Sequence, residues 1–208
     1  MQHLPKAARI DPKMLLTGIT LIYFIFRFIP VAESVLGVSL LPSHFTFVLV
    51  CFIIPASVFV LRPTPLWLRF PSAKGWLLGA LGGLLALALY LMVDALNPER
   101  GVHISAVRIF AFLTLIPVKS VIAVGEEVFF RGVLQEGLRA RGATPLQIVS
   151  ASAILFFAGH AYHPPIYWAA ILPYGLILGL VAFKTRSIWP STLAHAMGNA
   201  SVSFWLIR

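Results

Sequence analysis

The sequence is poor in charge and has almost no cysteine. Of its 208 residues only 11% are charged, whereas 59% are hydrophobic, and the mean hydropathy is +0.91. So few polar side chains cannot cover the surface of a water-soluble globule, which excludes that class and predicts an integral membrane protein surrounded by lipid bilayer. The single cysteine, Cys51, cannot form an intramolecular disulfide, and we interpret it as a small buried apolar residue.

Long hydrophobic runs dominate what remains. A membrane-spanning helix needs about 20 mainly apolar residues, and no repeat, low-complexity tract or long linker separates the candidate runs. We therefore expect an all-α polytopic membrane protein, a bundle of about seven transmembrane helices forming a single membrane domain of residues 1–208. The predicted spans are residues 14–32, 44–61, 75–95, 106–138, 145–161, 166–183 and 188–207.

Acidic residues are scarce, with 7 Asp and Glu against 16 Lys and Arg. Most of the basic residues lie in the N-terminal tail, residues 1–13, and in the connections after spans two, four and six. This asymmetry predicts a cytoplasmic N-terminus and an external C-terminus. The basic excess thus reflects topology, with contact to anionic lipid as an added expectation, and we expect no nucleic-acid partner. Because the first apolar run is too long for a signal peptide, we interpret it as an uncleaved anchor.

Three formal charges interrupt span four in the stretch VGEEVFFRG, Val124 to Gly132. A charged side chain at the centre of a lone membrane helix costs about 2.5–3.5 kcal/mol on insertion scales, so such residues are usually functional. The spacing of Glu127 and Arg131 predicts an i,i+4 ion pair. Glu126 points about 100° away around the helix and has no partner among these nine residues. The alternative is an ion network at a wet helix end.

Polar residues also occur in spans five and seven, where FFAGH contains His160 and HAMGN contains His195 and Asn199. Each alone is often only a hydrogen bond between helices. If spans four and five form a hairpin turning at residues 139–144, Glu126 and His160 lie roughly 20 and 24 Å from the turn. His195 and Asn199 lie about 12–18 Å in from the same side. We therefore expect these four side chains to converge in the cytoplasmic half of the bilayer.

Three motifs follow one another in a fixed order over roughly residues 120–200. EEVFFR fits the pattern EExxxR, FFAGH fits FxxxH, and HAMGN fits HxxxN. In these motifs the sequence resembles the CPBP family of intramembrane glutamate proteases, also called the ABI or type II CAAX prenyl endopeptidase family. The resemblance implies that about residues 106–207 form the catalytic core. The compact chain is similar to prokaryotic members, so we expect a multi-pass protein of a prokaryotic cell membrane.

The resemblance also implies roles for the residues that match the motifs. Glu126 would be the general base that activates the attacking water, and His160 would help to hold and polarise that water. His195 and Asn199 would donate hydrogen bonds to the tetrahedral oxyanion.

Glu127 and Arg131 would be a supporting ion pair, again by resemblance. The substrate would be a membrane-anchored protein or peptide, cleaved near the cytoplasmic side. Nothing in the sequence identifies a groove for a prenyl group.

Two alternatives remain open at this stage. One Glu and two His could bind catalytic zinc. However, HExxH is absent, and Asn199 beside His195 fits a pair of donors better than a ligand sphere, so we predict metal-free catalysis. No phosphate loop, dinucleotide fingerprint or EF-hand pattern occurs, so we expect no cofactor. The second alternative is a membrane immunity or scaffold protein that cleaves nothing, or a proton-coupled transporter.

Other features have ordinary structural interpretations. Gly75, Gly79 and Gly83 recur at four-residue spacing, which is typical of helix faces that pack closely in membranes. Arg27 and Asp94 are isolated charges within apolar runs. They could pair with each other, and the sequence does not decide this.

Overall fold

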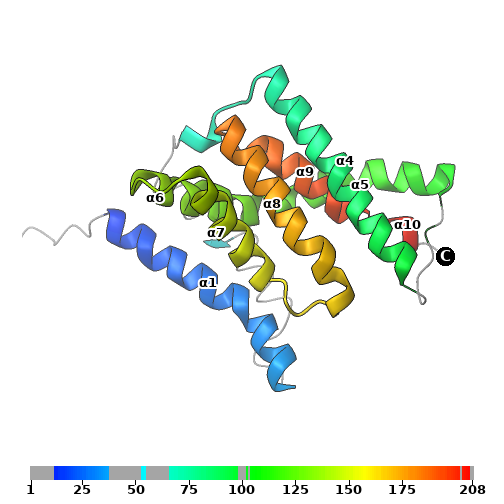
Figure 1. Ribbon diagram of the computed structural model, residues 1–208, viewed down its shortest axis with the longest axis horizontal. Coiled ribbons are helices and arrows are strands. Elements are labelled where there is room, and N and C mark those ends of the chain that lie inside the picture. The colour runs from blue at the N-terminus through cyan, green and yellow to red at the C-terminus, as the bar shows by residue number, and fades with distance from the viewer. Residues whose placement is uncertain are drawn as a thin grey trace, which may run out of the picture.

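The computed structural model describes residues 12–37, 53–54, 66–97, 102, 104–201 and 203–206. Within these ranges the chain forms helices joined by short connections and contains no strand, which confirms the expected all-α class (Figure 1). Most of the predicted tail and the span at 44–61, with Cys51, lie outside the described residues.

Four long helices are apolar enough to cross a membrane. They are α1 (Pro12–Leu36), α4 (Ala73–Leu96), α5 (Ala106–Glu127) and α8 (Trp168–Thr185). Without a break, α5 continues through a π-helical segment, η3 (Val128–Leu134), into α6 (Gln135–Ala140). The described residues therefore contain four candidate membrane spans, as expected of an integral membrane protein.

Two further helices are shorter than the sequence suggests. The predicted spans 145–161 and 188–207 contain α7 (Pro145–Ala158) and α9 (Ile188–Ala200), which have 14 and 13 residues. At 1.5 Å per residue each is about 20 Å long, less than the roughly 30 Å thickness of a hydrocarbon core. After α7, Pro164 precedes the 3₁₀ turn η4 (Pro165–Tyr167), and α9 ends before the short α10 (Ser203–Leu206).

Hydroxyl side chains begin the helices that build the core. Ser72 caps α4 and Ser105 caps α5, each by accepting a hydrogen bond from a backbone amide in the first helical turn. Thr144 and Gln147 form a capping box at the start of α7, with Pro145 in its first turn. Such caps satisfy amides that have no partner within the helix, so the sequence itself fixes where these helices begin.

Small residues let the core helices approach closely. α9 packs against both α4 and α5, and α8 packs against α7 and α4. A Cβ atom at Gly79 would lie 2.6 Å from the carbonyl oxygen of Pro190, and one at Gly83 would lie 2.3 Å from Sδ of Met197. Gly79 and Gly83 of the predicted glycine face of α4 thus pack against α9, whereas Gly75 meets Pro71 and Thr185.

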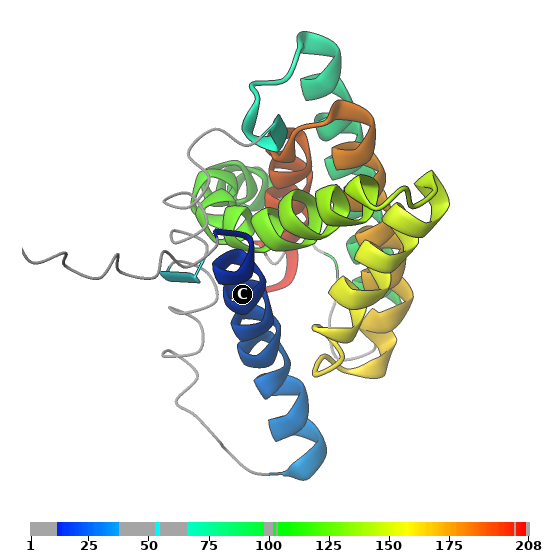
Figure 2. The same ribbon diagram turned by 90° about the vertical axis from the view of Figure 1, so that its left-hand side faces the viewer.

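Helix α1 lies at the edge of this arrangement in both views (Figures 1 and 2). It is attached by aromatic contacts to η3, where the ring of Tyr23 stacks on Phe129 with centroids 3.8 Å apart and Phe24 meets Phe130 edge to face. Its side chains Leu21 and Ile25 are each 59% exposed, as expected of a lipid-facing surface.

Candidate active site

The helix that contains Glu126 and Glu127 changes from α to π geometry directly after them, at Val128–Leu134. Inserted π turns of this kind occur mostly at functional sites. Gly132 allows Trp67 to pack against this segment, because a Cβ atom there would lie 2.9 Å from the indole ring. Ser152 donates a hydrogen bond of 2.9 Å to the carbonyl oxygen of Phe130. The sequence predicted one uninterrupted α-helix here and did not reveal the π segment.

Glu127, Arg131 and His195 form a fully buried polar network. Arg131 Nη1 donates to Glu127 Oε1 at 2.9 Å, as the i,i+4 spacing predicts, and both side chains are 0% exposed. Arg131 Nη2 donates to the carbonyl oxygen of Gly175 at 3.3 Å. His195 Nδ1 lies 2.8 Å from the same Glu127 oxygen. Because this network is buried, the alternative of ions at a wet helix end does not hold.

Glu126 faces both histidines. Its Oε2 atom lies 3.6 Å from Nε2 of His160 and 3.8 Å from Nε2 of His195. Its Oε1 atom lies 3.3 Å from Nη2 of Arg27 in α1. Oε2 is buried and has no hydrogen-bond partner within the described part of the chain. Three of the four side chains expected to converge are therefore brought together around one carboxylate oxygen.

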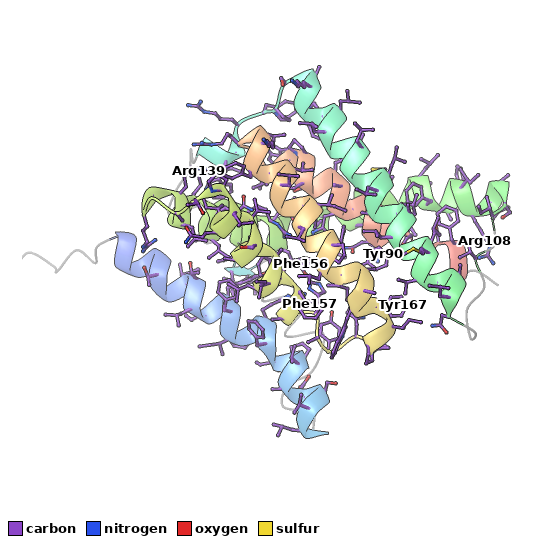
Figure 3. The ribbon with its side chains drawn as sticks, in the orientation of Figure 1. Tyr90, Arg108, Arg139, Phe156, Phe157 and Tyr167 are labelled. Carbon is purple, nitrogen blue, oxygen red and sulfur yellow. The ribbon has the colours of Figure 1, made fainter. Side chains whose placement is uncertain are left out.

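His160 follows the end of α7 and is held by the preceding turn. Its Nδ1 atom lies 2.7 Å from the carbonyl oxygen of Phe156, so Nδ1 carries a proton and donates it there. Nε2 is then the acceptor. Nη2 of Arg27 lies 2.6 Å from Nε2 and 3.1 Å from Nδ1, so the guanidinium lies over the imidazole ring. Phe156 lies between α7 and α8 in the middle of the molecule (Figure 3), and its ring also contacts the Arg131 guanidinium, 4.6 Å from the ring centroid.

His195 is fixed from two sides. Tyr174 donates a hydrogen bond of 2.6 Å to its backbone carbonyl, and Nδ1 donates to Glu127, since a carboxylate can only accept. Gly198 makes room for Tyr174, because a Cβ atom there would lie 2.5 Å from the tyrosine oxygen. Asn199 lies one turn beyond His195 and is half-buried. Its side chain makes no hydrogen bond to another described residue, so the structure does not join it to the cluster.

Arg27 is the site residue that the sequence did not reveal. It contacts Glu126 and His160, whereas Asp94 accepts a hydrogen bond of 2.8 Å from Tyr167. The suggested pairing of Arg27 with Asp94 is therefore replaced by one with Glu126. The sequence offered one indication of this contact: Arg27 has no partner in its own apolar run, and Glu126 has none in span four.

The described residues include no group of three or more His, Cys, Asp or Glu side chains arranged to hold a metal ion. Beside these groups lies a cation of the protein itself, since Nη2 of Arg27 is 2.6 Å from Nε2 of His160 and 3.3 Å from Oε1 of Glu126. Metal-free catalysis stays a prediction.

A family comparison covers most of this site. Residues 108–201 match the family model of type II CAAX prenyl endopeptidase Rce1-like proteins. Over these residues the chain is similar to the Rce1-like family. Comparisons with curated proteins and with solved structures give no significant match. This similarity supports a CAAX-protease-like membrane peptidase. All the predicted site residues lie within the matched segment, whereas Arg27 lies outside it.

Proposed function

We propose that this protein is an intramembrane endopeptidase that hydrolyses a peptide bond of a membrane-anchored protein or peptide, with water activated by Glu126. The observation that carries the proposal is the unpartnered, buried Oε2 atom of Glu126, which faces Nε2 of His160 at 3.6 Å and Nε2 of His195 at 3.8 Å. A water molecule at hydrogen-bond distance, about 2.8 Å, would donate its two protons to two of these acceptors, Oε2 of Glu126 and Nε2 of His160.

In the proposed reaction Glu126 acts first as a base and then as an acid. Its carboxylate takes one proton from the water, whose oxygen attacks the carbonyl carbon of the scissile peptide bond. The second water proton points to the Nε2 lone pair of His160, which aligns the nucleophile. When the tetrahedral intermediate collapses, the proton held by Glu126 passes to the leaving amine, and the carboxylate is restored.

The oxyanion requires donors on the opposite side of the carbonyl group. His195 donates Nδ1–H to Glu127 at 2.8 Å, so it donates from Nε2 only when the ring carries both protons and is an imidazolium. Asn199, one turn further along α9, has an amide free among the described residues to supply a second donor. Loss of one such donor typically lowers the rate ~10²–10³-fold.

Glu127 and Arg131 complete the proposal as supporting residues. The guanidinium fixes the carboxylate, and the carboxylate fixes the imidazole of His195. Both are buried within a water-excluding aromatic surrounding that includes Phe130 and Phe156. In such a low-dielectric environment, aligned charges act more strongly than they would in water.

The experiment that tests the function is proteolysis of a lipid-anchored peptide library in proteoliposomes. Wild type is compared with Glu126→Gln, which keeps the shape and removes the base, and with Glu136→Gln, a control at a partly exposed carboxylate in α6. We expect cleavage by wild type and the control and none by Glu126→Gln at equal protein levels.

Other results have definite meanings. Equal cleavage by all three proteins would remove Glu126 from the chemistry. Absence of cleavage by wild type would favour a non-proteolytic immunity or scaffold role, or proton-coupled transport.

The metal-free character has a separate test. We expect that chelators leave the activity unchanged, because the proposed base is the Glu126 carboxylate, which activates water without a metal. Proteolysis is measured with and without a chelator, followed by added zinc. Inhibition that zinc restores would contradict the glutamate mechanism.

A further inference from the structure

Lys119 is a charged residue inside the membrane-spanning helix α5 that the proposed reaction does not use. At 1.5 Å per residue it lies about 20 Å from the start of α5, and farther than that from the end of α6. Within the described part of the chain it takes part in no ion pair or hydrogen bond. Charged residues at such depth are costly, and they usually face the bundle interior and bind substrate or ions there.

The face of α5 that carries Lys119 is the one that packs into the bundle. Successive residues of an α-helix are turned by about 100°. Lys119 therefore lies within roughly 40° of Ala123 and 20° of Glu126, both of which are buried. Val121, on the opposite face, is 57% exposed. Lys119 is thus directed inward, and its side chain is half-buried.

Two contacts show which part of α9 and α10 lies opposite Lys119. Nδ1 of His195 lies 2.8 Å from Oε1 of Glu127, and the ring centroids of Phe112 and Phe204 lie 5.5 Å apart. The helices are antiparallel, because the later residue on one side meets the earlier residue on the other. Lys119 is midway between Phe112 and Glu127, so its level on the other side is midway between His195 and Phe204.

Two polar side chains without a partner lie within about one helical turn of that level. Asn199 is half-buried, and its amide makes no hydrogen bond to a described residue. Ser203 is 1% exposed, and its Oγ atom has no hydrogen-bond partner in the described ranges. Together with Lys119 they provide an ammonium, an amide and a hydroxyl, all of which can donate. A positive charge beside further donors suits a carboxylate, which only accepts.

We propose that Lys119 is a specificity-determining residue that binds a carboxylate of the substrate, with the hydroxyl of Ser203 as a second donor. The inference rests on the proposed function, because it places the scissile bond at Glu126. Along α5 the two residues are about 10 Å apart, and an extended peptide advances about 3.3 Å per residue. The carboxylate therefore belongs to about the third residue beyond the scissile bond, as a free C-terminus or as an acidic side chain.

The test uses the best-cleaved peptide of the lipid-anchored library in three forms. The first ends in a free carboxylate three residues beyond the cleaved bond, the second ends there in an amide, and the third is this amide with aspartate as its last residue. We measure kcat/KM for each form in proteoliposomes with wild type, Lys119→Met, Lys119→Arg and Ser203→Ala.

Wild type should cleave the first or the third form about 10- to 100-fold better than the plain amide, the range that a charge-assisted hydrogen bond corresponds to. The preferred form identifies the source of the carboxylate. Lys119→Met should cleave all three forms equally, at the rate of the plain amide. Lys119→Arg should keep most of the preference, and Ser203→Ala should lose about fivefold of it.

Lys184→Met, at an exposed lysine in the last turn of α8, is the matched control and should keep the wild-type preference. Each preference is a ratio measured within one protein, so a lower yield of folded protein does not change it. Lys119→Gln replaces Lys119→Met if size-exclusion profiles show that the latter is not folded.

Two results would overturn the inference and leave the proposed function standing. One is a wild type that cleaves the three forms equally, and the other is an unchanged preference in the folded Met or Gln variant. A wild type that cleaves none of the library would instead contradict the proposed function, and the role of Lys119 with it.

Discussion

At the scale of single residues, the site consists of two carboxylates that each have their own guanidinium. Glu127 pairs with Arg131 from the same helix, and Glu126 pairs with Arg27 from another. Each carboxylate keeps one buried oxygen, Oε2, without a hydrogen-bond partner among the described residues. Only the Oε2 atom of Glu126 faces imidazole nitrogens, at 3.6 and 3.8 Å, which is why we propose Glu126 as the base and Glu127 as its support.

The effect of Glu127 on activity can be measured separately from its effect on the stability of the fold. Glu127→Gln leaves the Arg131 guanidinium buried without its partner, and breaking a buried ion pair costs about 3–5 kcal/mol. Removing both charges with Arg131→Met should regain much of that stability, whereas activity should stay low because His195 has lost its carboxylate. Thermal unfolding in detergent and the proteolysis assay measure the two quantities. Recovery of activity in the double variant would contradict the role of Glu127.

Gly198 offers a second residue-scale test. In Gly198→Ala the new methyl group would meet the Tyr174 oxygen at 2.5 Å, and overpacking of this kind costs about 1–3 kcal/mol. Tyr174 would release the backbone carbonyl of His195, so activity should fall as well. Gly18→Ala in α1, where nothing lies within 4 Å, is the control. Equal melting temperatures for the two variants would show that the close contact is not needed.

At the scale of elements, the π-helical segment η3 connects the catalytic residues to the rest of the fold. It directly follows Glu127 and includes Arg131, and its aromatic residues hold α1 through Tyr23 and Phe24. Trp67 of the short 3₁₀ helix η2 (Leu66–Leu68) packs on it at Gly132. The η3 segment therefore packs against α1 on one side and against Trp67 on another.

A substitution in η3 should change the geometry of the candidate active site. Gly132→Ala places a methyl group 2.9 Å from the Trp67 ring, so either the ring or the π turn must shift. We expect a loss of stability of about 1–3 kcal/mol and reduced proteolysis. Gly137→Ala in α6 is the comparison, because a Cβ atom there meets only the flexible end of Arg141 at 3.3 Å. Similar losses of stability and proteolysis in both variants would mean that the site does not depend on the packing of η3.

The elements also show what the sequence could and could not predict. The pairing of Glu127 with Arg131 followed from i,i+4 spacing, and the approach of His160 and His195 to Glu126 followed from counting residues back to common turns. The π geometry leaves no periodic signal, since hydrophobic residues surround it on every face. The sequence could not predict that Arg27 contacts Glu126, because the two residues lie in different helices far apart in the sequence, where residue spacing does not indicate contact. The roles of these residues and of Asn199 stay predictions.

At the scale of the whole molecule, the distribution of basic residues sets the expected orientation. The turns that contain Arg141 and Lys184 lie at the ends of α6 and α8. We predict that both are cytoplasmic, because positive residues near short loops are retained on that side. Reporter fusions after these residues should both give cytoplasmic signals, whereas an external signal from either would reverse the orientation.

The shortness of α7 has a consequence for the surrounding bilayer. With 14 residues this helix, which precedes His160, falls roughly 10 Å short of an average hydrocarbon core. Its side chains Leu146 and Ile154 are exposed, whereas α9 is almost wholly buried among other helices. Lipid adjusts to such a hydrophobic mismatch by thinning locally, and we expect a thinned bilayer beside α7 to shorten the distance that water must travel to reach Glu126.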